Sequence, residues 1–596
     1  MCDIRPYKNQ DYEALKSKHN SKDLFVDPEF PATNKSIYHS GKRLTDVQWH
    51  RPTTVFRKAQ FVIDGFQRGD LDQGEIGNCW FIAGSGAVTL NPDLLQRVVP
   101  SNQSFDGDDY AGIFHFRFWL YGYWYDVVID DQLPFHSDGR LVFCRNKKDK
   151  NEMWAPLLEK AYAKICGSYE AMEGGFTTDA LIDMTGGIEE AFELNNSSTV
   201  NAEFKERVKR VLWQAYLRKS MLGCSITADP NVTEARLSNG LVKGHAYSIT
   251  RVADVTTSSG PVTLVRCLNP WGNETEWNGK YSDNSNAWSE ISDEEKEELG
   301  VNTINDGEFW MSFDDFFSNF HQLHICHRGP ASLGTTEDDA GSCTWTNLFR
   351  DDKLTWKEEM LHGEWVPGST AGGCGQPNKE NYWINPQYLV RLRMIDDDDD
   401  ENLCTMIVAL MQKETRQRRL RGLEGEDYMQ FRVFKIKDGV NVQDNIEQGN
   451  LKFYMNQLER VGASGSYINR REVTKRFRVP PGDYIIIPST YDADKPGKFL
   501  LRMFTEKQAD QAQLDQDKED LTEADVFFQD ENIDVLFGEW SSLFGGDAEE
   551  AATSKPINPD IGGVFPSPRP DLPSNFDGGD INDNEMYPQK RFCSIM

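Results

Sequence analysis

The chain of 596 residues has no run of the roughly eighteen apolar residues that a membrane-spanning helix requires. Its first residues, Met1 to Pro6, contain no apolar signal region, so we expect neither a membrane span nor secretion. The eleven cysteines are an odd number, scattered without close pairs or the spacing of metal ligands. This usage favours a reducing, cytoplasmic location over a disulfide framework.

Positive charge is also in short supply. Lys and Arg number 64 against 95 Asp and Glu, which gives a formal net charge of -31. Because such a chain repels phosphates, nucleic acid is excluded as the expected partner. The many carboxylates are ligands for hard cations, and calcium is the cofactor that this composition indicates.

The length predicts several domains rather than one hydrophobic core. Paired glycines at Thr185-Gly186-Gly187 favour a hinge within a region that mixes helical and strand patterns. Strand-like runs separated by turns follow, and they predict an antiparallel β-sandwich. The predicted class is α+β, with an N-terminal extension at 1–24, two subdomains at 25–186 and 187–330, the sandwich at 340–505, and an acidic, Pro-containing, mostly disordered tail at 506–596.

Cys79 lies where a glycine-rich loop gives way to an apolar, helix-like stretch that runs to Leu90. A cysteine at a helix N-terminus is stabilised as thiolate by the helix dipole and by free N–H groups, so Cys79 is a candidate nucleophile. Gln73 precedes it by six residues. Taken alone, a single cysteine is more often a small buried apolar residue.

Two further residues change that balance. His245 lies in Gly244-His245-Ala246-Tyr247, and Asn269 lies in Leu268-Asn269-Pro270-Trp271. In papain-like chemistry the histidine takes the thiol proton, the asparagine orients the ring, and the glutamine amide forms the oxyanion hole with the cysteine N–H. Trp271 either shields the Asn269–His245 hydrogen bond from water or is an ordinary core residue.

Several longer segments carry a resemblance. Gln73 to Trp80, Gly240 to Thr250 and Asp306 to Phe313 resemble the protease core of the calpain family, and Trp365 to Tyr388 resembles its β-sandwich. The resemblance covers roughly residues 25 to 505. It implies a papain-like protease core of two subdomains, one with the Cys and one with the His and Asn. It also implies a calcium-activated intracellular cysteine endopeptidase that makes limited cuts in protein substrates.

The resemblance also implies two calcium sites in the core, whose occupation draws the subdomains together. The alternative is that the acids are solvated surface residues. One extra residue after Trp271 leaves Glu274 as an alternative to Glu276 in the second site. The implied ligands of the first site are Ile63, Gly65, Asp70 and Glu152, and those of the second are Glu276, Asp283, Ile304, Asp306 and Glu308.

Two other features depart from the family pattern. Asn78 stands where the family usually has Asp, and Gly84 with Gly86 interrupts the helix after Cys79. Each glycine costs up to about 1 kcal/mol relative to Ala, which predicts a looser helix. No catalytic role is lost.

Two metal-like patterns are set aside. His321, His324 and His327 resemble a zinc cluster, but in a strand His324 would face away from the other two. A run at Asp515 begins like an EF-hand loop, yet Asp520 replaces the turn Gly and Val526 the bidentate Glu. We therefore expect no penta-EF-hand domain and no small penta-EF-hand subunit as partner.

Two other functions stay open at this point. One is a catalytically silent, calcium-dependent membrane or scaffold protein that keeps the fold, against which the intact Gln73, Cys79, His245 and Asn269 argue. The other is a transglutaminase, which shares Cys and His but uses Asp as the third residue. Asn269 argues against the second.

The segment Cys593-Ser594-Ile595-Met596 matches a C-a-a-X box loosely, because Ser594 is not aliphatic, while Met596 favours farnesyl. A single isoprenoid gives reversible membrane binding. We expect a fraction of the protein on membranes, with calcium at the acidic run from Asp396 to Glu401 bridging to lipid phosphates.

Cys593→Ser is predicted to return the membrane-bound fraction to the soluble fraction, because it removes the lipidated thiol. Fractionation of expressing cells in calcium and in chelator measures the partition. Mass spectrometry that finds the C-terminal Cys593 unmodified would rule out the lipid.

Overall fold

The computed structural model describes residues 4–42, 46–107, 110–194, 201–217, 219–227, 235–269, 276–301, 307–327, 356–376, 378–393, 395, 402–420, 426–442 and 452–506. The acidic run from Asp396 to Glu401 lies outside these residues, as does the tail from 507 onward with Cys593. Within the described residues, no helix combines the length and the apolar character needed to cross a bilayer.

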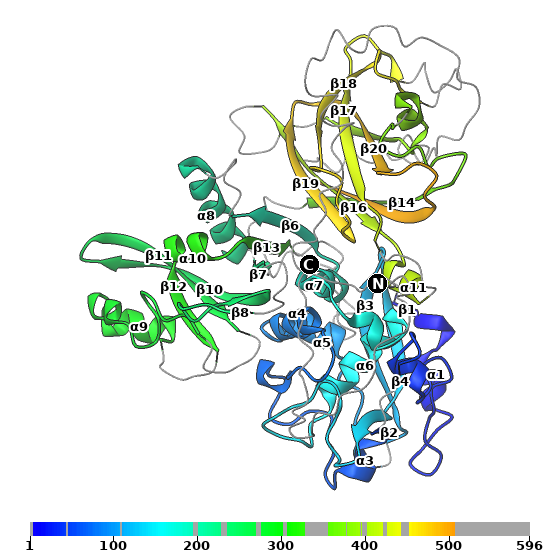
Figure 1. The fold of residues 1–596 in the computed structure, drawn as a ribbon, viewed down its shortest axis with the longest axis vertical. Helices are drawn as coiled ribbons and strands as arrows, with labels where there is room; N and C mark the ends of the chain where they lie inside the picture. The colour runs from blue at the N-terminus through cyan, green and yellow to red at the C-terminus, as the bar shows by residue number, and fades with distance from the viewer. Residues whose placement is uncertain are drawn as a thin grey trace, which may run out of the picture.

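The first part of the chain surrounds a three-stranded sheet with the order β1-β4-β3. Strands β3 and β4 pair antiparallel, and β1 joins β4 in parallel, so the N-terminal residues belong to this sheet (Figure 1). The helices pack around it in a core rich in aromatic side chains. The elements are β1 (Ile4–Pro6), η1 (Tyr7–Asn9), α1 (Tyr12–Lys16), α2 (Asn34–Ile37), β2 (Val47–His50), α3 (Pro52–Val55), η2 (Arg68–Asp70), α4 (Cys79–Thr89), α5 (Pro92–Val98), β3 (Ile113–Leu120), β4 (Tyr123–Asp130), β5 (Leu133–His136), α6 (Trp154–Cys166), η4 (Glu170–Met172) and α7 (Thr177–Thr185).

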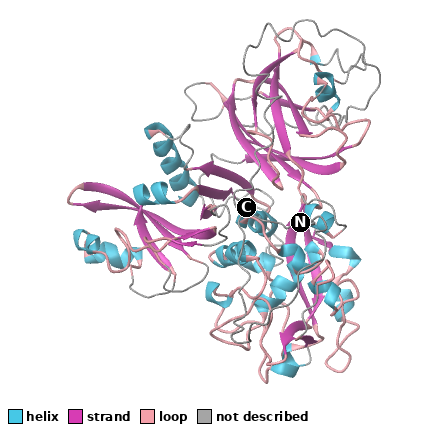
Figure 2. Cartoon of the chain, in the orientation of Figure 1, coloured by secondary structure: helices cyan, strands magenta, loops and turns pink. Residues whose placement is uncertain are grey.

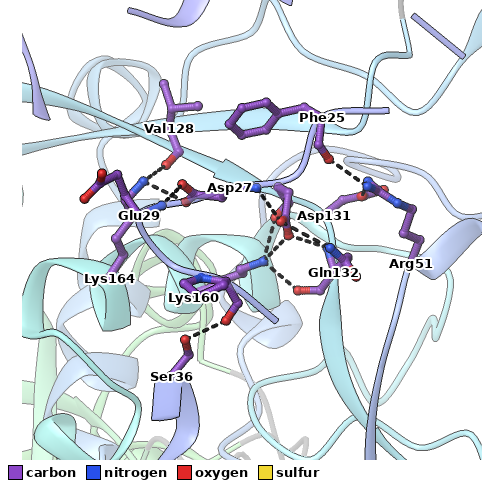
Figure 3. A network of polar contacts seen from close by, with 12 residues as sticks. Phe25, Asp27, Glu29, Ser36, Arg51, Val128, Asp131, Gln132, Lys160 and Lys164 are labelled. Atoms are coloured by element: carbon purple, nitrogen blue, oxygen red, sulfur yellow. Dashed lines mark hydrogen bonds and ion pairs between the residues drawn. The ribbon is translucent and has the colours of Figure 1, made fainter. Parts of the chain in front are cut away.

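Two lysines on α6 fasten this part internally (Figure 3). Lys160 Nζ lies 2.5 Å from Asp130 Oδ1, and Lys164 Nζ lies 2.7 Å from Asp27 Oδ2, with all four side chains fully buried. Lys164 also donates to the carbonyl of Val128 on β4 at 2.6 Å. These charges are tolerated in the interior because each is paired and hydrogen-bonded. They join α6 to the sheet and to the segment that precedes α2.

Helix α7 ends at Thr185, and Gly186 follows it with a φ of 67°. This left-handed conformation is the one that glycine adopts most readily at the end of a helix. Strand β6 begins two residues later, at Ile188. The chain therefore passes into its second part at Gly186 and Gly187, where the paired glycines predict a hinge.

The second part is built on a six-stranded sheet with the order β12-β11-β10-β7-β13-β6, in which every pairing is antiparallel. Its own apolar core includes Val208, Tyr247 and Phe316. In Figure 1 this part lies beside the first part, with α4 and α7 nearest to it. The elements are β6 (Ile188–Glu193), α8 (Ala202–Leu217), β7 (Met221–Ile226), β8 (Ala235–Arg236), β9 (Val242–Lys243), β10 (His245–Thr257), β11 (Gly260–Leu268), η5 (Asn286–Glu290), α9 (Asp293–Leu299), β12 (Glu308–Ser312), α10 (Phe313–Asn319) and β13 (Gln322–His327).

The third part is a sandwich of two four-stranded antiparallel sheets, ordered β14-β21-β16-β19 and β15-β20-β17-β18. Alternate residues such as Met406, Val408 and Leu410 of β16 point into a core shared with Phe431 and Phe499. Figure 2 shows its long strands as a layer distinct from the helix-rich first part. The elements are β14 (Trp356–Trp365), η9 (Lys379–Ile384), β15 (Tyr388–Leu392), β16 (Cys404–Gln412), α11 (Thr415–Arg419), β17 (Met429–Ile436), β18 (Leu458–Ala463), β19 (Glu472–Val479), β20 (Gly482–Thr490) and β21 (Gly497–Glu506).

This architecture confirms the predicted α+β class, with a two-part core followed by an antiparallel sandwich. The domain boundaries at 24, 186, 330 and 505 stay predictions. Helix α4 runs unbroken from Cys79 to Thr89 although it contains Gly84 and Gly86. A Cβ on Gly84 would lie 2.7 Å from Ala180 Cβ, so close packing of α4 on α7 requires a glycine there.

Arg502 of the sandwich binds the junction between the first two parts. Its Nη2 donates to the carbonyl of Gly186 and its Nη1 to that of Gly187, both at 2.6 Å. Nη2 also lies 2.6 Å from Glu358 Oε1, and the arginine side chain is fully buried. The guanidinium lies over the ring of Trp119, 4.5 Å from its centroid. One buried charge therefore holds both hinge carbonyls.

The sandwich also forms ion pairs with α7 and β6, the elements on either side of this junction. Arg471 Nη1 donates to Asp183 Oδ2 of α7 at 3.0 Å, and Arg476 Nη2 pairs with Glu190 Oε2 of β6 at 3.2 Å. Burial opposes ionisation of Glu190, but His327 and Arg476 lower its pKa to about 2. The last helix of the first part and the first strand of the second are thus fastened to the same sandwich.

Arg502→Met is predicted to lower the free energy of unfolding by about 3–5 kcal/mol, because it leaves two carbonyls and Glu358 buried without their donor. The shift of the urea unfolding midpoint measures the loss. Arg140→Gln is the control, since the Arg140 side chain is 62% exposed and such a surface pair contributes little to stability. Equal shifts for the two variants would contradict this role of Arg502.

Candidate active site

Cys79 is the first residue of α4, and its side chain is 2% exposed. The carbonyl of Asn78 accepts the N–H groups of Phe81 and Ile82, which starts the helix immediately at Cys79. The thiol therefore lies at the positive end of the helix dipole, where a thiolate is favoured. Cys79 packs against Ala246, the neighbour of His245.

His245 begins β10, and Asn269 follows the end of β11 in the same sheet. His245 Nε2 lies 2.9 Å from Asn269 Oδ1, and both side chains are fully buried. With Oδ1 as acceptor, Nε2 carries the proton, so Nδ1 is the basic nitrogen of the ring. The N–H of Asn269 donates to the carbonyl of Gly307 at 2.9 Å, which ties the asparagine to the residue just before β12. Asparagine thus sets both the tautomer and the direction of the ring.

The loop from Gln73 to Asn78 packs on the segment from 142 to 145. Gln73 Nε2 donates to the carbonyl of Ile76 at 2.7 Å, and the N–H of Glu75 donates to the carbonyl of Val142 at 3.0 Å. A Cβ on Gly74 would lie within 2.4 Å of the Phe143 backbone, so only glycine fits there. The glutamine amide is therefore held beside the loop that leads to Cys79.

Trp80, the second residue of α4, anchors the start of this helix. Its Nε1 donates to the carbonyl of Met172 at 2.9 Å, and the guanidinium of Arg416 lies 4.2 Å from the ring centroid. Arg416 comes from α11 of the sandwich and pairs with Asp179 of α7 at 3.3 Å. Sequence reasoning missed Arg416, since no local pattern connects it with Cys79.

At the expected first calcium site, Asp70 and Glu152 lie on either side of Asn146. The Asn146 amide donates to Asp70 Oδ1 at 3.0 Å and to Glu152 Oε2 at 2.6 Å. Burial and the nearby charge of Asp70 together raise the pKa of Glu152 to about 7, although the hydrogen bonds from Ile63 and Asn146 oppose the rise. Burial likewise raises the pKa of Asp70 above its usual range. Asn146 is the member of this group that sequence reasoning did not find.

Ile63 contacts the same group, and Gly65 follows it by two residues in the chain. The N–H of Ile63 donates to Glu152 Oε1, and Gly65 has a φ of 86°, which a glycine tolerates. Asp70 and Glu152 are thus two buried carboxylates with raised pKa values, and both supply oxygen donors. This chemistry fits a hard cation such as calcium.

Glu276 and Glu308 of the expected second site lie on either side of Gly307. Glu276 Oε1 accepts the N–H of Gly307 at 2.8 Å. Glu308 Oε1 lies 3.6 Å from Arg68 Nη1 and 3.5 Å from Arg266 Nε. Because Arg68 belongs to η2 with Asp70, this ion pair connects the two expected sites across the junction.

Of the other residues expected at that site, Asp283 is half-buried. The remaining ones, Glu274, Ile304 and Asp306, lie outside the described residues, and so does Trp271, the candidate for shielding the Asn269–His245 bond. In the described ranges no group of three or more His, Cys, Asp or Glu side chains is arranged to hold a metal ion. His324 and His327 instead pair with acids of β6, at 3.1 Å with Glu189 and 2.8 Å with Glu190.

Comparison with known proteins gives consistent matches along the chain. Residues 25–327 match the model described as calpain family cysteine protease, and residues 361–504 match the model of calpain large subunit domain III. Calpain-A of Drosophila melanogaster is 45% identical over 85% of this chain and 58% of its own length. Calpain clp-1 of Caenorhabditis elegans is 42% identical over 83% and 60%, respectively. The human calpain-2 catalytic subunit is 40% identical over 92% of this chain and 75% of its own length.

Cys79→Ala is predicted to abolish cleavage of a protein substrate, because no other group replaces the sulfur nucleophile. Asn269→Ala is predicted to lower kcat roughly 10²-fold, since the Cys79–His245 pair stays but the ring loses its restraint. Casein hydrolysis by the purified variants measures both effects. Calcium-stimulated cleavage by Cys79→Ala would show that the nucleophile is another residue.

Proposed function

The chain belongs to the calpain family of cysteine proteases, and we propose that it is a calcium-activated cysteine endopeptidase that makes limited cuts in protein substrates. One observation carries this proposal. His245 is oriented by Asn269 at 2.9 Å on one sheet, while Cys79 opens a helix of the other part and packs against Ala246. This arrangement supplies a nucleophile, a base and an orienting amide from two halves of one core.

The first half of the reaction follows from these positions. His245 Nδ1 takes the proton of the Cys79 thiol, and the thiolate attacks the carbonyl carbon of the scissile peptide bond. Negative charge develops on the carbonyl oxygen, and the Cys79 N–H with the Gln73 amide donates hydrogen bonds to it. For this the Gln73 amide exchanges its bond to the Ile76 carbonyl for one to substrate.

Collapse of the tetrahedral adduct breaks the C–N bond. The imidazolium of His245 gives its proton to the leaving amine, which leaves an acyl group on Cys79. His245 then takes a proton from water, whose oxygen attacks the acyl carbon. The thiolate leaves and is protonated again, and Asn269 holds the ring in one direction throughout.

We propose that Asp70, Glu152 and the carbonyls of Ile63 and Gly65 bind one calcium ion. Glu276 or Glu274, with Asp283, Ile304, Asp306 and Glu308, bind the second. When bound, calcium supplies positive charge that orders these oxygen ligands. Asp70 lies three residues before Gln73, so ordering its loop also orders the oxyanion donor. Arg68 links this loop to Glu308 on the other part of the core.

The remaining expectations are proposals as well. We propose that the protein acts in the cytoplasm without a small penta-EF-hand subunit, and that Trp271 covers the Asn269–His245 bond. We also propose farnesylation at Cys593 and reversible membrane contact. Trp271, the run at Asp515 and Cys593 lie outside the described residues, while the cytoplasmic location is supported by the scattered cysteines.

Asp70→Ala combined with Glu152→Ala is predicted to raise the calcium concentration for half-maximal activity at least about tenfold, because two of the charged ligands are lost. Calcium titrations of casein hydrolysis measure the shift, and circular dichroism checks the fold. Asp138→Ala is the control, since this acid is exposed and pairs only with Arg140 in the described structure. An unchanged titration curve for the double variant would remove these residues from the calcium switch.

A further inference from the structure

Glu159 on α6 places a buried carboxylate beside the catalytic loop. Its Oε1 accepts the Asn78 amide Nδ2 at 2.7 Å, and its Oε2 accepts the N–H of Cys144 at 2.9 Å. The side chains of Asn78 and Glu159 are 0% and 1% exposed. One carboxylate thus joins the residue before Cys79 to the segment on which the loop from Gln73 packs.

The same face of α6 also supports the start of α4. Tyr162 lies one turn after Glu159, and its ring centroid lies 4.6 Å from that of Phe81. The carbonyl of Asn78 begins the hydrogen-bonding ladder of α4. A displacement of Asn78 therefore moves both the thiol and the N–H of Cys79, which are the nucleophile and an oxyanion donor.

Glu159 has no ion-pair partner in the described part of the chain. Burial raises its pKa to about 7, and the hydrogen bonds from Asn78 and Cys144 with the charge of Arg145 oppose the rise. The other titratable groups that face it, Cys144 and Tyr169, are neutral at this pH because burial raises their pKa values. Glu159 therefore exists in both protonation states near neutral pH.

Asn78 suits both states. Its Nδ2 donates to the ionised carboxylate, while its Oδ1 is buried without a hydrogen-bond partner among the described residues. If Glu159 gains a proton, a turn of the amide presents Oδ1 to the new O–H donor. An aspartate at this position, which the calpain pattern usually has, lacks the donor and adds a second carboxylate.

We infer that Glu159 is a positioning residue of the catalytic loop, and that Asn78 preserves their contact whether or not Glu159 is protonated. This inference rests on the proposed protease function, because cleavage is its readout. As a consequence, the catalytic loop keeps the same geometry over a broad range of pH. If the Asn78 amide is replaced by a carboxylate, the loop keeps this geometry only at the pH values at which that carboxylate and Glu159 share a proton.

Asn78→Asp tests the pairing directly. Two adjacent buried carboxyls share one proton at low pH and repel each other once both ionise. With calcium and saturating casein, the ratio of variant to wild-type kcat is expected to fall at least about tenfold between about pH 6.5 and about pH 8.5, with KM little changed. Asn78→Asp combined with Glu159→Gln restores a hydrogen-bonding amide and is expected to recover most of the activity at the higher pH.

Glu159→Ala and Glu159→Gln show whether the loop needs the hydrogen bonds of Glu159 or only its negative charge. Gln keeps an acceptor for the Cys144 N–H and a donor for Asn78 Oδ1, so kcat stays near that of wild type. Ala removes both contacts and lowers kcat about 10- to 100-fold. Glu170→Gln is the control, because Glu170 is another buried glutamate of this part but binds Ser40 rather than the loop. Its pH profile is expected to match that of wild type.

The outcomes are distinct. If wild type cuts casein with calcium but Asn78→Asp keeps the wild-type pH profile, the inference about Glu159 is wrong and the protease proposal stands. If the double variant stays inactive at the higher pH while Glu159→Gln alone is active, the shared-proton explanation is wrong. If wild type cuts nothing at any calcium concentration, the protease proposal fails, and the inference fails with it.

Discussion

The buried guanidinium of Arg502 donates hydrogen bonds to the carbonyls of Gly186 and Gly187, where the two parts of the core meet. A peptide segment with φ in the left-handed region and two glycines has little stiffness of its own. The arginine satisfies carbonyls that burial would otherwise leave unpaired. The position of one part relative to the other therefore depends on a side chain that lies more than 300 residues later in the chain.

This dependence matters because the catalytic groups are divided between the same two parts. Cys79 is the first residue of α4, and its two chain neighbours are both held by other elements. Asn78 is hydrogen-bonded to Glu159, and the ring of Trp80 packs against the guanidinium of Arg416. His245 and Asn269 are placed by neighbouring strands of the six-stranded sheet. A small rotation at Gly186 changes the distance between thiol and imidazole without disturbing either half. The ion pair between Arg68 and Glu308 crosses this boundary, between the two proposed calcium sites.

Much of the fold and of the site followed from local patterns in the sequence. The α+β class, the start of a helix at Cys79 and the break after Thr185 each rest on nearby residues, and the order of Gln73, Cys79, His245 and Asn269 is distinctive. Arg416, Asn146 and Glu159 could not be found in this way, because their roles come from contacts between distant segments. Glu159 follows a run of apolar residues in the sequence, yet only the fold shows that it is buried and that Asn78 and Cys144 are its partners. The catalytic and calcium-binding roles of all these site residues stay predictions, and Trp271, Glu274, Ile304 and Asp306 lie outside the described residues.

We propose that the thiolate of Cys79 and the imidazole of His245 form one catalytic pair across the Gly186 junction when calcium binds. The most direct measurement is the rate at which a thiol-directed peptide chloromethyl ketone modifies Cys79, followed by mass spectrometry of the peptide that contains it. The account predicts fast modification of wild type in calcium, slow modification in chelator, and slow modification of His245→Ala in both. Equal rates with and without calcium, or an unchanged rate in His245→Ala, would contradict it.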